Sequence, residues 1–308
     1  TNKGLQLEVT MNIKISISKL FNAVRQGFSL TNKPIRNYGK LAIASVMSLL
    51  LAVTLNPFVV NALDLSDLLR VLPSAVQIIQ LSNIGDNDEI ALGQQIDRQI
   101  QQEVRISRDP MANALVTRLG QILTPASDRP NIPYTFRVVD DNSLNAFATM
   151  GGFVYINTGT IAASDNVAQL ASVIGHEMGH IAGRHALEQM KQMAIAQGIA
   201  TIAGVGDDRL VGIGVNLALR LPNSREAEFD ADRRGLLNIT KVGFAASAMP
   251  AFMQKLASSG NAPSFLSTHP ATGDRIAALN QNIRANNLNT SGGLNDSDYQ
   301  RIWKSRFL

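Results

Sequence analysis

Residues 176–180 read His-Glu-Met-Gly-His, so two histidines flank a glutamate. On a helix, His176 and His180 fall about 40° apart on one face, one turn apart along the axis. Two neutral imidazoles placed in this way can hold one Zn²⁺, which lowers the pKa of its bound water to about 7 and polarises a carbonyl. Glu177 can then take the proton of the attacking water and pass it to the leaving amine. The pentapeptide therefore predicts peptide-bond hydrolysis, with a buried helix carrying two structural histidines as the alternative.

The residues around the pentapeptide favour a buried helix. Leu170, Ile174, Met178 and Ile181 recur at three- and four-residue steps, which is the spacing of one apolar helix face. Ser164–Asn166 just ahead are N-cap candidates. The pattern predicts one continuous helix of about 25 residues that carries the motif.

A catalytic zinc needs a third protein ligand and one open position. In the pattern HExxHxxGxxH a third histidine follows a helix-breaking glycine. Here Gly183 fits that pattern, but position 186 is Ala186. The neighbouring His185 falls about 140° round a continuous helix from His180. We therefore expect His185 to point away from the metal as a polar or packing residue.

Two other regions can supply the third ligand. Glu228 and Asp232 are four residues apart in an acidic segment, so one can bind the metal while the other holds a ligand histidine. Glu226 lies about 120° from Asp232 on a helix and fits that pairing poorly. His269, which precedes Pro270, is the other candidate. On the residues alone these alternatives stay open, together with a solvated acidic face.

Three motifs in this order, HEMGH, SREAEFDAD and THPATGDRI, resemble those of the HtpX-like and BepA-like zinc metallopeptidases. These are gluzincins related to the CAAX prenyl-protein peptidases and to the mitochondrial stress peptidase of the inner membrane. The resemblance extends over about residues 85–285. It implies one Zn²⁺ per subunit held by His176, His180 and Glu228, with Glu177 as the catalytic base and Asp232 orienting a ligand histidine.

The same resemblance gives His269 one of two roles. It either stabilises the tetrahedral intermediate or acts as a reversible fourth ligand that blocks the water. The resemblance also implies that Arg275 is a structural ion-pair partner.

The segment Gly151–Gly159 resembles the strand that lies above the active-site helix in these enzymes. A peptidase can bind its substrate as an added antiparallel strand through main-chain hydrogen bonds. We therefore expect Gly151, Gly152, Phe153, Val154 and Tyr155 to form a substrate-binding edge, with an ordinary sheet edge as the alternative.

The N-terminal part of the chain has the features of a targeting segment. Residues 1–62 carry seven basic side chains and one acidic one, which is a net charge of +6. The whole chain has a net charge of +4. An uncharged run, Leu41–Leu55, follows the basic residues and precedes a possible cleavage site at Ala62. We expect a signal peptide or, alternatively, a membrane anchor over 1–62, which would place the remainder on the extracytoplasmic side, in the periplasm or its equivalent.

The composition excludes several classes of function. The chain has 308 residues, is 45% hydrophobic and contains no cysteine, which rules out thiolate zinc sites, disulfides and cysteine nucleophiles. Because the basic charge belongs to the N-terminus, the remaining residues carry about −2 and give no indication of nucleic-acid binding.

The periodicity and turn residues predict an α+β fold that is mainly α-helical, in which a zincin-like metallopeptidase domain has a small β-sheet next to the HExxH helix. We expect a linker over 63–84 and a single domain over 63–308. The expected elements are helices over 86–105 and 109–123 and strands over 134–139, 144–148 and 153–157, the last two as a hairpin. Residues 193–221 are expected to form a buried helical hairpin or, alternatively, a mobile lid near the cleft. Further helices are expected to begin after Ser224, over 244–257 and near His269.

These observations predict a zinc-dependent metalloendopeptidase that acts on polypeptides. From the resemblance we expect the substrates to be misfolded or stalled envelope proteins, with possible membrane association through the N-terminal segment. The alternative is a non-catalytic chaperone or adaptor on the same fold. An intact Glu177 argues against it, because a binding module has no need of a general base.

Overall fold

The computed structural model describes residues 84–196, 208–258, 264–270, 273–288, 290–295 and 297–307. The chain divides into two units, Thr1–Leu68 and Leu69–Leu308, and the described residues all belong to the second. The expected targeting segment and the linker up to residue 83 lie outside the described residues.

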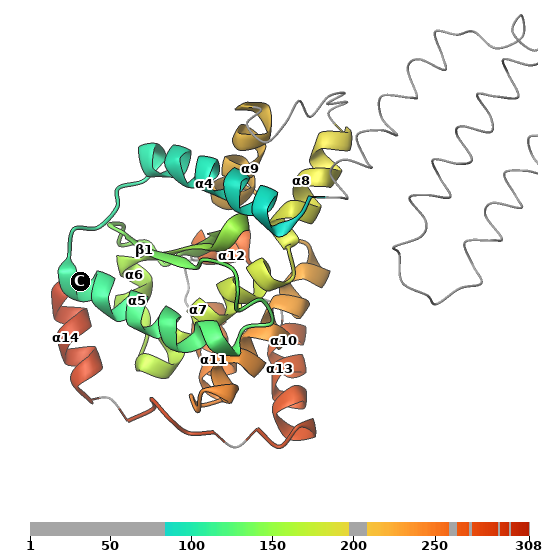
Figure 1. Cartoon of the computed structure of the whole chain (residues 1–308). Coiled ribbons are helices and arrows are strands. Elements are labelled where there is room, and N and C mark those ends of the chain that lie inside the picture. The colour runs from blue at the N-terminus through green and yellow to red at the C-terminus, as the bar shows by residue number, and fades with distance from the viewer. Residues whose placement is uncertain are drawn as a thin grey trace, which may run out of the picture. The chain divides into compact units, whose positions relative to one another are not determined.

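Helices make up most of the described chain (Figure 1). They are α4 (Asp86–Glu103), α5 (Pro110–Leu123), α6 (Thr158–Ala163), α7 (Val167–Ala182), α8 (His185–Ala196), α9 (Asp208–Arg220), α10 (Arg225–Lys241), α11 (Ala248–Ser258), α12 (Ser264–Thr268), α13 (Gly273–Ala285) and α14 (Ser297–Phe307). The strands are β1 (Thr135–Val139), β2 (Ala146–Thr149) and β3 (Phe153–Asn157). This mainly helical α+β fold with a small sheet confirms the predicted fold class.

Side-chain caps explain where three of the helices begin. Asp109, Asn166 and Ser224 precede α5, α7 and α10, and the side chain of each accepts a hydrogen bond from a backbone N–H two or three residues later. Such caps satisfy N–H groups that have no partner within the helix. Asn166 is the one among the three expected N-cap candidates that caps α7.

The three strands form one sheet in the order β1-β3-β2. β3 runs parallel to β1 and antiparallel to β2, so β2 and β3 form the expected hairpin across the turn Met150–Gly152. β3 is the central strand and all five of its residues are buried. The outer edge next to α7 therefore belongs to β2.

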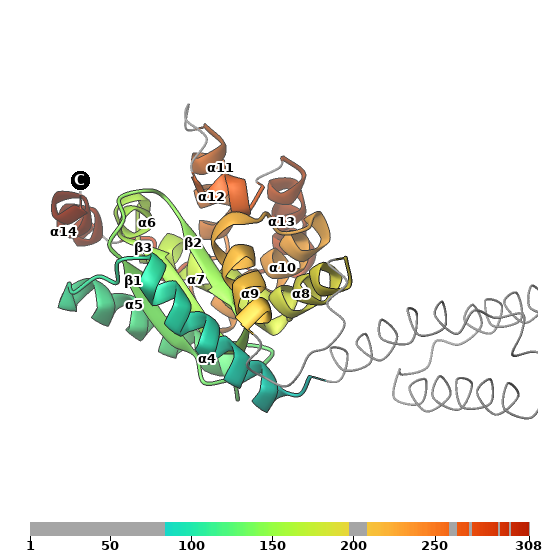
Figure 2. The same cartoon turned by 90° about the horizontal axis from the view of Figure 1, so that it is seen from above.

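The sheet separates two hydrophobic cores, because alternate side chains of a strand point to opposite faces. The α7 core contains Val154 and Ile156 of β3 together with buried residues of α5, α6, α7, α10, α11, α13 and α14. The α9 core contains Phe153 and Tyr155 with buried residues of α4, α8 and α9. Figures 1 and 2 show α4, α8 and α9 on one side of the sheet and α7 and α10 on the other.

Helices α7 and α10 approach each other closely, and glycines make that approach possible. A Cβ added at Gly179 would lie 2.5 Å from the carbonyl oxygen of Ala231. A Cβ added at Gly235 would lie 2.8 Å from the backbone nitrogen of His176. This close contact brings side chains of α10 within reach of the motif on α7.

The helix that carries HEMGH is shorter than predicted. Helix α7 has 16 residues and ends at Ala182, and α8 begins at His185. The helix is interrupted between them at Arg184, whose φ is 56°. This is a left-handed conformation that a right-handed helix cannot accommodate. The expectation of one continuous helix of about 25 residues was therefore wrong.

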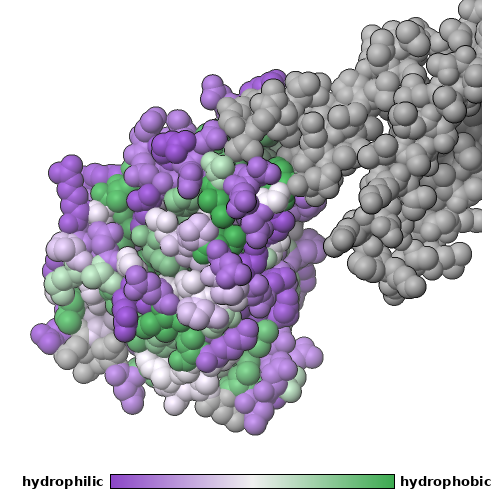
Figure 3. Space-filling view, in the orientation of Figure 1, coloured by the Kyte–Doolittle hydropathy of each residue, from purple (hydrophilic) through white to green (hydrophobic). Residues whose placement is uncertain are grey.

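Figure 3 shows hydrophilic side chains over most of the visible face, with smaller hydrophobic areas between them. Met111 and Leu294 are large hydrophobic residues that remain exposed. In the part of the chain that the structure describes, no helix is both long enough and apolar enough to cross a membrane.

Candidate metal centre

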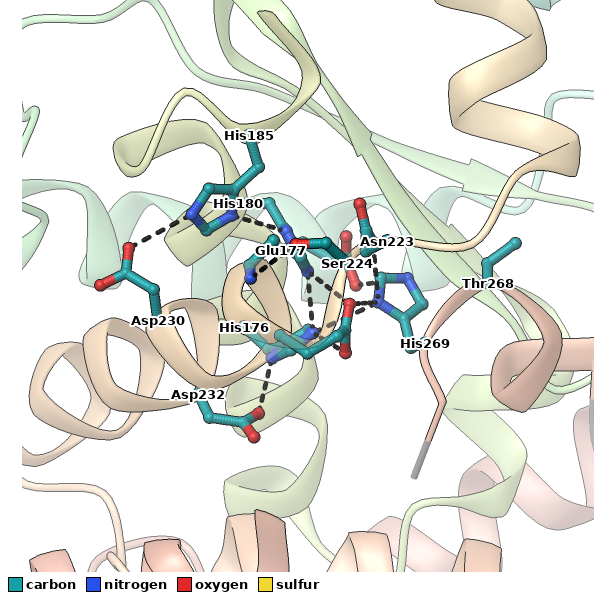
Figure 4. Close-up of polar contacts among 12 residues, drawn as sticks. His176, Glu177, His180, His185, Asn223, Ser224, Asp230, Asp232, Thr268 and His269 are labelled. Carbon is teal, nitrogen blue, oxygen red and sulfur yellow. Dashed lines mark hydrogen bonds and ion pairs between the residues drawn. The ribbon is translucent and has the colours of Figure 1, made fainter. Parts of the chain in front are cut away.

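Four side chains from three parts of the chain meet beside β2, an edge strand of the sheet. His176 and His180 extend from one face of α7, and His269 follows α12 (Figure 4). Glu228 comes from the first turn of α10. Each of the four residues offers one potential ligand atom, and these four atoms all lie within 4.8 Å of one another. All four residues are buried, and together they are called the donor group. The structure thus brings together both histidines of the motif and both candidates for a further ligand.

The distances within this group fit a small tetrahedral ion. The Nε2 atoms of His176 and His180 are 3.1 Å apart, and His176 Nε2 is 3.3 Å from His269 Nδ1. Glu228 Oε1 lies 3.2 Å from His180 Nε2 and 3.0 Å from His269 Nδ1. Zinc bonds of 2.0–2.1 Å in tetrahedral geometry hold ligand atoms about 3.3 Å apart. Imidazole nitrogens and one carboxylate are also donors that suit Zn²⁺.

The outer nitrogen of His176 is held by a carboxylate. Asp232 Oδ1 lies 2.9 Å from His176 Nδ1, so it can accept the Nδ1–H and leave Nε2 free to face the donor group. Arg275 donates from Nε and Nη2 to both oxygens of Asp232, each at 2.7 Å, and also lies beside Glu228. The structure therefore places Asp232 and Arg275 where the motif resemblance implies an orienting carboxylate and its ion-pair partner.

The surroundings shift the pKa values of the two motif histidines in opposite directions. Burial opposes protonation of His176, but its contacts with Asp232 and Glu228 raise its pKa to about 10. Burial lowers the pKa of His180 to about 3. Burial alone would raise the pKa of Glu228, yet attraction to His269 and hydrogen bonds from the histidines hold it well below its usual range. The group thus keeps an ionised carboxylate among imidazoles, and a bound dication would take the place of the proton on His176.

Glu177 lies next to this group in a cavity between α7, α9 and β2. Among the described residues, neither of its carboxylate oxygens has a hydrogen-bond partner, although Oε1 lies 3.5 Å from His269 Nε2. Burial raises the pKa of Glu177. The cavity is lined by polar side chains, among them Glu177, His180, Asn223, Thr268 and His269, and by the apolar residues Ile96, Met150, Leu217 and Ala218 together with Gly214.

His269 is oriented by three contacts. Its Nε2 lies 3.3 Å from the carbonyl oxygen of Ala146 in β2, and its ring stacks on Phe265 with 4.5 Å between centroids. Because Nε2 donates to the carbonyl oxygen of Ala146, Nδ1 carries a lone pair, which faces the other three members of the donor group. The side-chain nitrogen of Asn223 also lies 3.4 Å from His269 Nδ1. Asn223 was not among the predicted site residues, since its position follows from the loop before α10 and from no motif.

His185 is a polar residue outside the metal group, as the sequence predicted, but it contacts a metal-site histidine. Its Nδ1 lies 2.9 Å from Nδ1 of His180, and its Nε2 lies 3.2 Å from Asp230 Oδ2. It stays outside the donor group, as expected, but it is the outer neighbour of a donor. The angle of about 140° assumed a continuous helix, and the break at Arg184 turns His185 back toward His180. Gly183 was the one signal in the sequence that such a break was possible.

The predicted substrate-binding edge also needs correction. Phe153, Val154 and Tyr155 belong to β3, which has a neighbouring strand on each side, and Gly151 and Gly152 are buried in the turn before it. These five residues cannot offer a free edge. The strand that borders the cavity is β2, whose residues Phe147, Ala148 and Thr149 line it.

The fold and the donor group together define a class of protein. It is that of metallopeptidases in which an HExxH helix and a glutamate from a later helix hold the metal. Residues 110–283 match the sequence model of peptidase family M48. This match covers more than half of the 308 residues, so the chain belongs to peptidase family M48. The resemblance to zinc metallopeptidases and the assignment to a family of peptidases are both confirmed.

Individual relatives agree with the family. A protein of Vibrio cholerae serotype O1, provisionally named beta-barrel assembly-enhancing protease, is 29% identical over 221 residues, which are 66% of this chain and 46% of the relative. The beta-barrel assembly-enhancing protease of Escherichia coli K12 is 27% identical over 213 residues, 64% of this chain and 44% of the relative. The mitochondrial metalloendopeptidase OMA1 of Arabidopsis thaliana is 34% identical over 155 residues, 49% and 32% respectively. The chain therefore spans about half or less of the length of these relatives.

Proposed function

We propose that this chain is a zinc-dependent metalloendopeptidase that hydrolyses peptide bonds within polypeptides. The observation that carries the proposal is the position of Glu177. It is a fully buried carboxylate beside the four potential metal ligands, and it lines a cavity. Burying a carboxylate without a hydrogen-bond partner is costly, so such a group points to a function at this place. A non-catalytic chaperone would not need it.

Each residue has a distinct task in the proposed reaction. Zinc, when bound by His176, His180 and Glu228, supplies Lewis-acid activation of water and of the substrate carbonyl. Glu177 accepts the proton of the attacking water and delivers it to the leaving amine, a role suited to a carboxylate whose pKa is raised by burial. Asp232 holds His176 in the tautomer that turns Nε2 to the metal.

We place the substrate along β2. Residues that face each other in an antiparallel pair alternate between hydrogen-bonded and non-hydrogen-bonded positions. Asn157 N donates to Asn145 O, so the register turns the backbone groups of Ala146 and Ala148 outward. The outward carbonyl of Ala146 already faces His269. The N–H and C=O of Ala148, beside the cavity, are the groups to which a substrate strand would bind.

The proposed role of His269 is that of a reversible fourth ligand. Its Nδ1 lies among the donors, where it competes with water for the remaining metal position. A substrate strand on β2 would compete with the contact between His269 Nε2 and Ala146, which would release the ring. Substitution His269→Ala is therefore expected to raise cleavage of a short peptide while zinc stays bound. A fall in cleavage would instead assign His269 to stabilising the intermediate.

The proposal is tested by measuring zinc content and the cleavage of casein and of a fluorogenic peptide for the wild-type chain and for Glu177→Gln. We expect one zinc per chain in both proteins. Cleavage by Glu177→Gln should fall by about 100- to 10,000-fold, because the base is lost. Full activity in this variant, or wild-type protein without zinc, would contradict the proposal. A zinc-loaded wild-type chain that binds unfolded polypeptides without cleaving them would favour the chaperone alternative.

We further propose that the N-terminal segment directs the chain out of the cytoplasm. There it would act on misfolded or stalled envelope proteins. The basic residues before Leu41–Leu55 support this location. The names of the bacterial relatives, which refer to the assembly of β-barrels, support this substrate class. Expression of the full chain in bacteria followed by fractionation tests the location, and capture of bound polypeptides by Glu177→Gln tests the substrates. Recovery in the cytoplasm, or capture of cytoplasmic proteins alone, would contradict it.

A further inference from the structure

His185 lies directly behind the metal ligand His180, on the side away from the donor group. The two Nδ1 atoms are 2.9 Å apart, and His185 Nε2 is 3.2 Å from Asp230 Oδ2, so the three side chains form one line (Figure 4). We propose that His185, held by Asp230, is a positioning residue that orients His180 for metal binding. This inference rests on the metal site proposed above.

The break between α7 and α8 is what directs His185 to this place. The backbone of Arg184 adopts a φ of 56°, which costs energy for a residue with a side chain. Its side chain is held on both sides, since Nη2 donates to the carbonyl oxygen of Ile84 at 2.7 Å and Nε lies 2.9 Å from the buried Glu89. The surroundings thus hold Arg184 in an unfavourable conformation that returns His185 to His180.

Gly183 supplies the space that the His185–Asp230 contact needs. Its φ is −77°, which any residue can adopt, so conformational freedom does not explain the glycine. A Cβ at this position would instead lie 2.3 Å from His185 Nε2 and 2.9 Å from Asp230 Oδ2. A larger residue would therefore push the two side chains apart.

The order of donors and acceptors is consistent along the line. For His180 to present the lone pair of Nε2 to the metal, its Nδ1 must carry the hydrogen and donate it. His185 Nδ1 accepts this hydrogen only when the hydrogen of His185 is on Nε2, and Asp230 Oδ2 is the acceptor that favours this tautomer. Asp230 is itself held by Arg233 at 2.7 Å and by Arg234 at 2.5 Å.

Two substitutions separate the positioning role from a purely structural one. Asparagine at 185 places its carboxamide oxygen near the position of Nδ1, so His185→Asn keeps an acceptor for His180. Glutamine places its nitrogen near the position of Nε2, so His185→Gln keeps the donor to Asp230 and loses that acceptor. The readout is the dissociation constant for zinc, measured by competition with a chromophoric chelator.

Loss of such an outer hydrogen bond weakens metal binding about 10- to 100-fold. We expect His185→Ala and His185→Gln to show this loss and His185→Asn to stay within about threefold of the wild type. Wild-type affinity in the alanine and glutamine variants, or equal losses in the asparagine and glutamine variants, would overturn the inference. Should the alanine variant not fold, the asparagine–glutamine pair decides. A wild-type chain that binds no zinc would instead refute the metal site itself.

Gly183→Ala tests the same inference without changing any of the three side chains. We expect zinc affinity to fall toward that of His185→Gln. The matched control is Gly212→Ala, since a Cβ there meets nothing within 4 Å. Equal zinc affinities for both alanine variants would contradict the proposed spacing.

Discussion

The two sides of the sheet differ in what they contribute to the site. On the side of the α7 core, helices α7 and α10 bring His176, His180 and Glu228 together and surround them with buried charged partners such as Asp232 and Arg275. On the side of the α9 core, α4 and α9 contribute three apolar residues and one glycine, Gly214, to the lining of the cavity. In the proposed function, the first side holds the metal and the second shapes the space for substrate.

This difference indicates which parts of the site can vary. Metal ligands must keep their positions within a fraction of an ångström, and close glycine-mediated contacts between two helices provide that accuracy. Residues on the α9 wall only have to fill or leave space, so substitution there is expected to change substrate preference while the metal stays bound.

The largest effect is expected on the α7 side, for Glu228→Gln. A zinc site of four ligands is worth about 10–16 kcal/mol, so the loss of one ligand is expected to cost about 3 kcal/mol and to weaken zinc binding roughly 100-fold. Chelator competition measures this loss, and peptide cleavage at limiting zinc should fall with it. Unchanged zinc affinity would mean that Glu228 is not a ligand.

The second prediction concerns the packing of α7 against α10. Gly235→Val forces side-chain atoms toward the backbone of His176, and overpacking of this kind costs about 1–3 kcal/mol. We expect a lower free energy of unfolding in urea and weaker zinc binding, because α10 carries Glu228 and Asp232 away from the histidines. The control Gly212→Ala should stabilise the chain by up to about 1 kcal/mol. Wild-type stability for Gly235→Val would show that the helices do not need this close contact.

A substitution on the α9 wall should separate substrate choice from metal binding. Ala218→Leu narrows the cavity, and a change of this size in an apolar pocket is worth about 1–2 kcal/mol. We expect kcat/KM for peptides with a large apolar side chain to fall roughly 10-fold relative to alanine peptides. Zinc affinity should equal that of the wild type. A parallel loss of zinc would mean that the two sides are not independent.

The smallest effect is expected at the edge of β2. Ala148→Pro removes the outward N–H that we assign to substrate binding, and one hydrogen bond is worth about 1 kcal/mol, or roughly fivefold in kcat/KM. Ala148→Ser keeps the N–H and is the matched control. If both variants cleave peptides with equal kcat/KM, the substrate does not pair with Ala148.

Local signals in the sequence predicted much of the fold. The N-caps Asp109 and Ser224, the hairpin of β2 and β3, and the helix around HEMGH all follow from residues close together in the chain. The order of the strands does not, because the parallel pairing of β1 with β3 joins distant segments. For this reason β3, which was predicted from the sequence to offer a sheet edge, is the central strand.

The candidate site shows the same limit. Spacing and motif resemblance brought forward His176, Glu177, His180, Glu228, Asp232 and His269, and the structure places all six together. The position of His185 could not be predicted, since it depends on a left-handed Arg184 that is stabilised by Ile84 and Glu89 from another part of the chain. Asn223 was missed for a similar reason, because the loop before α10 sets its position.

Anomalous diffraction at the zinc edge, from crystals of the zinc-loaded chain, shows whether helices α7 and α10 hold the metal. We predict one zinc peak within about 2.0–2.2 Å of His176 Nε2, His180 Nε2 and a carboxylate oxygen of Glu228. A zinc ion bound elsewhere, or bound to the two histidines while Glu228 remains away from it, would show that these three side chains are not the ligand set.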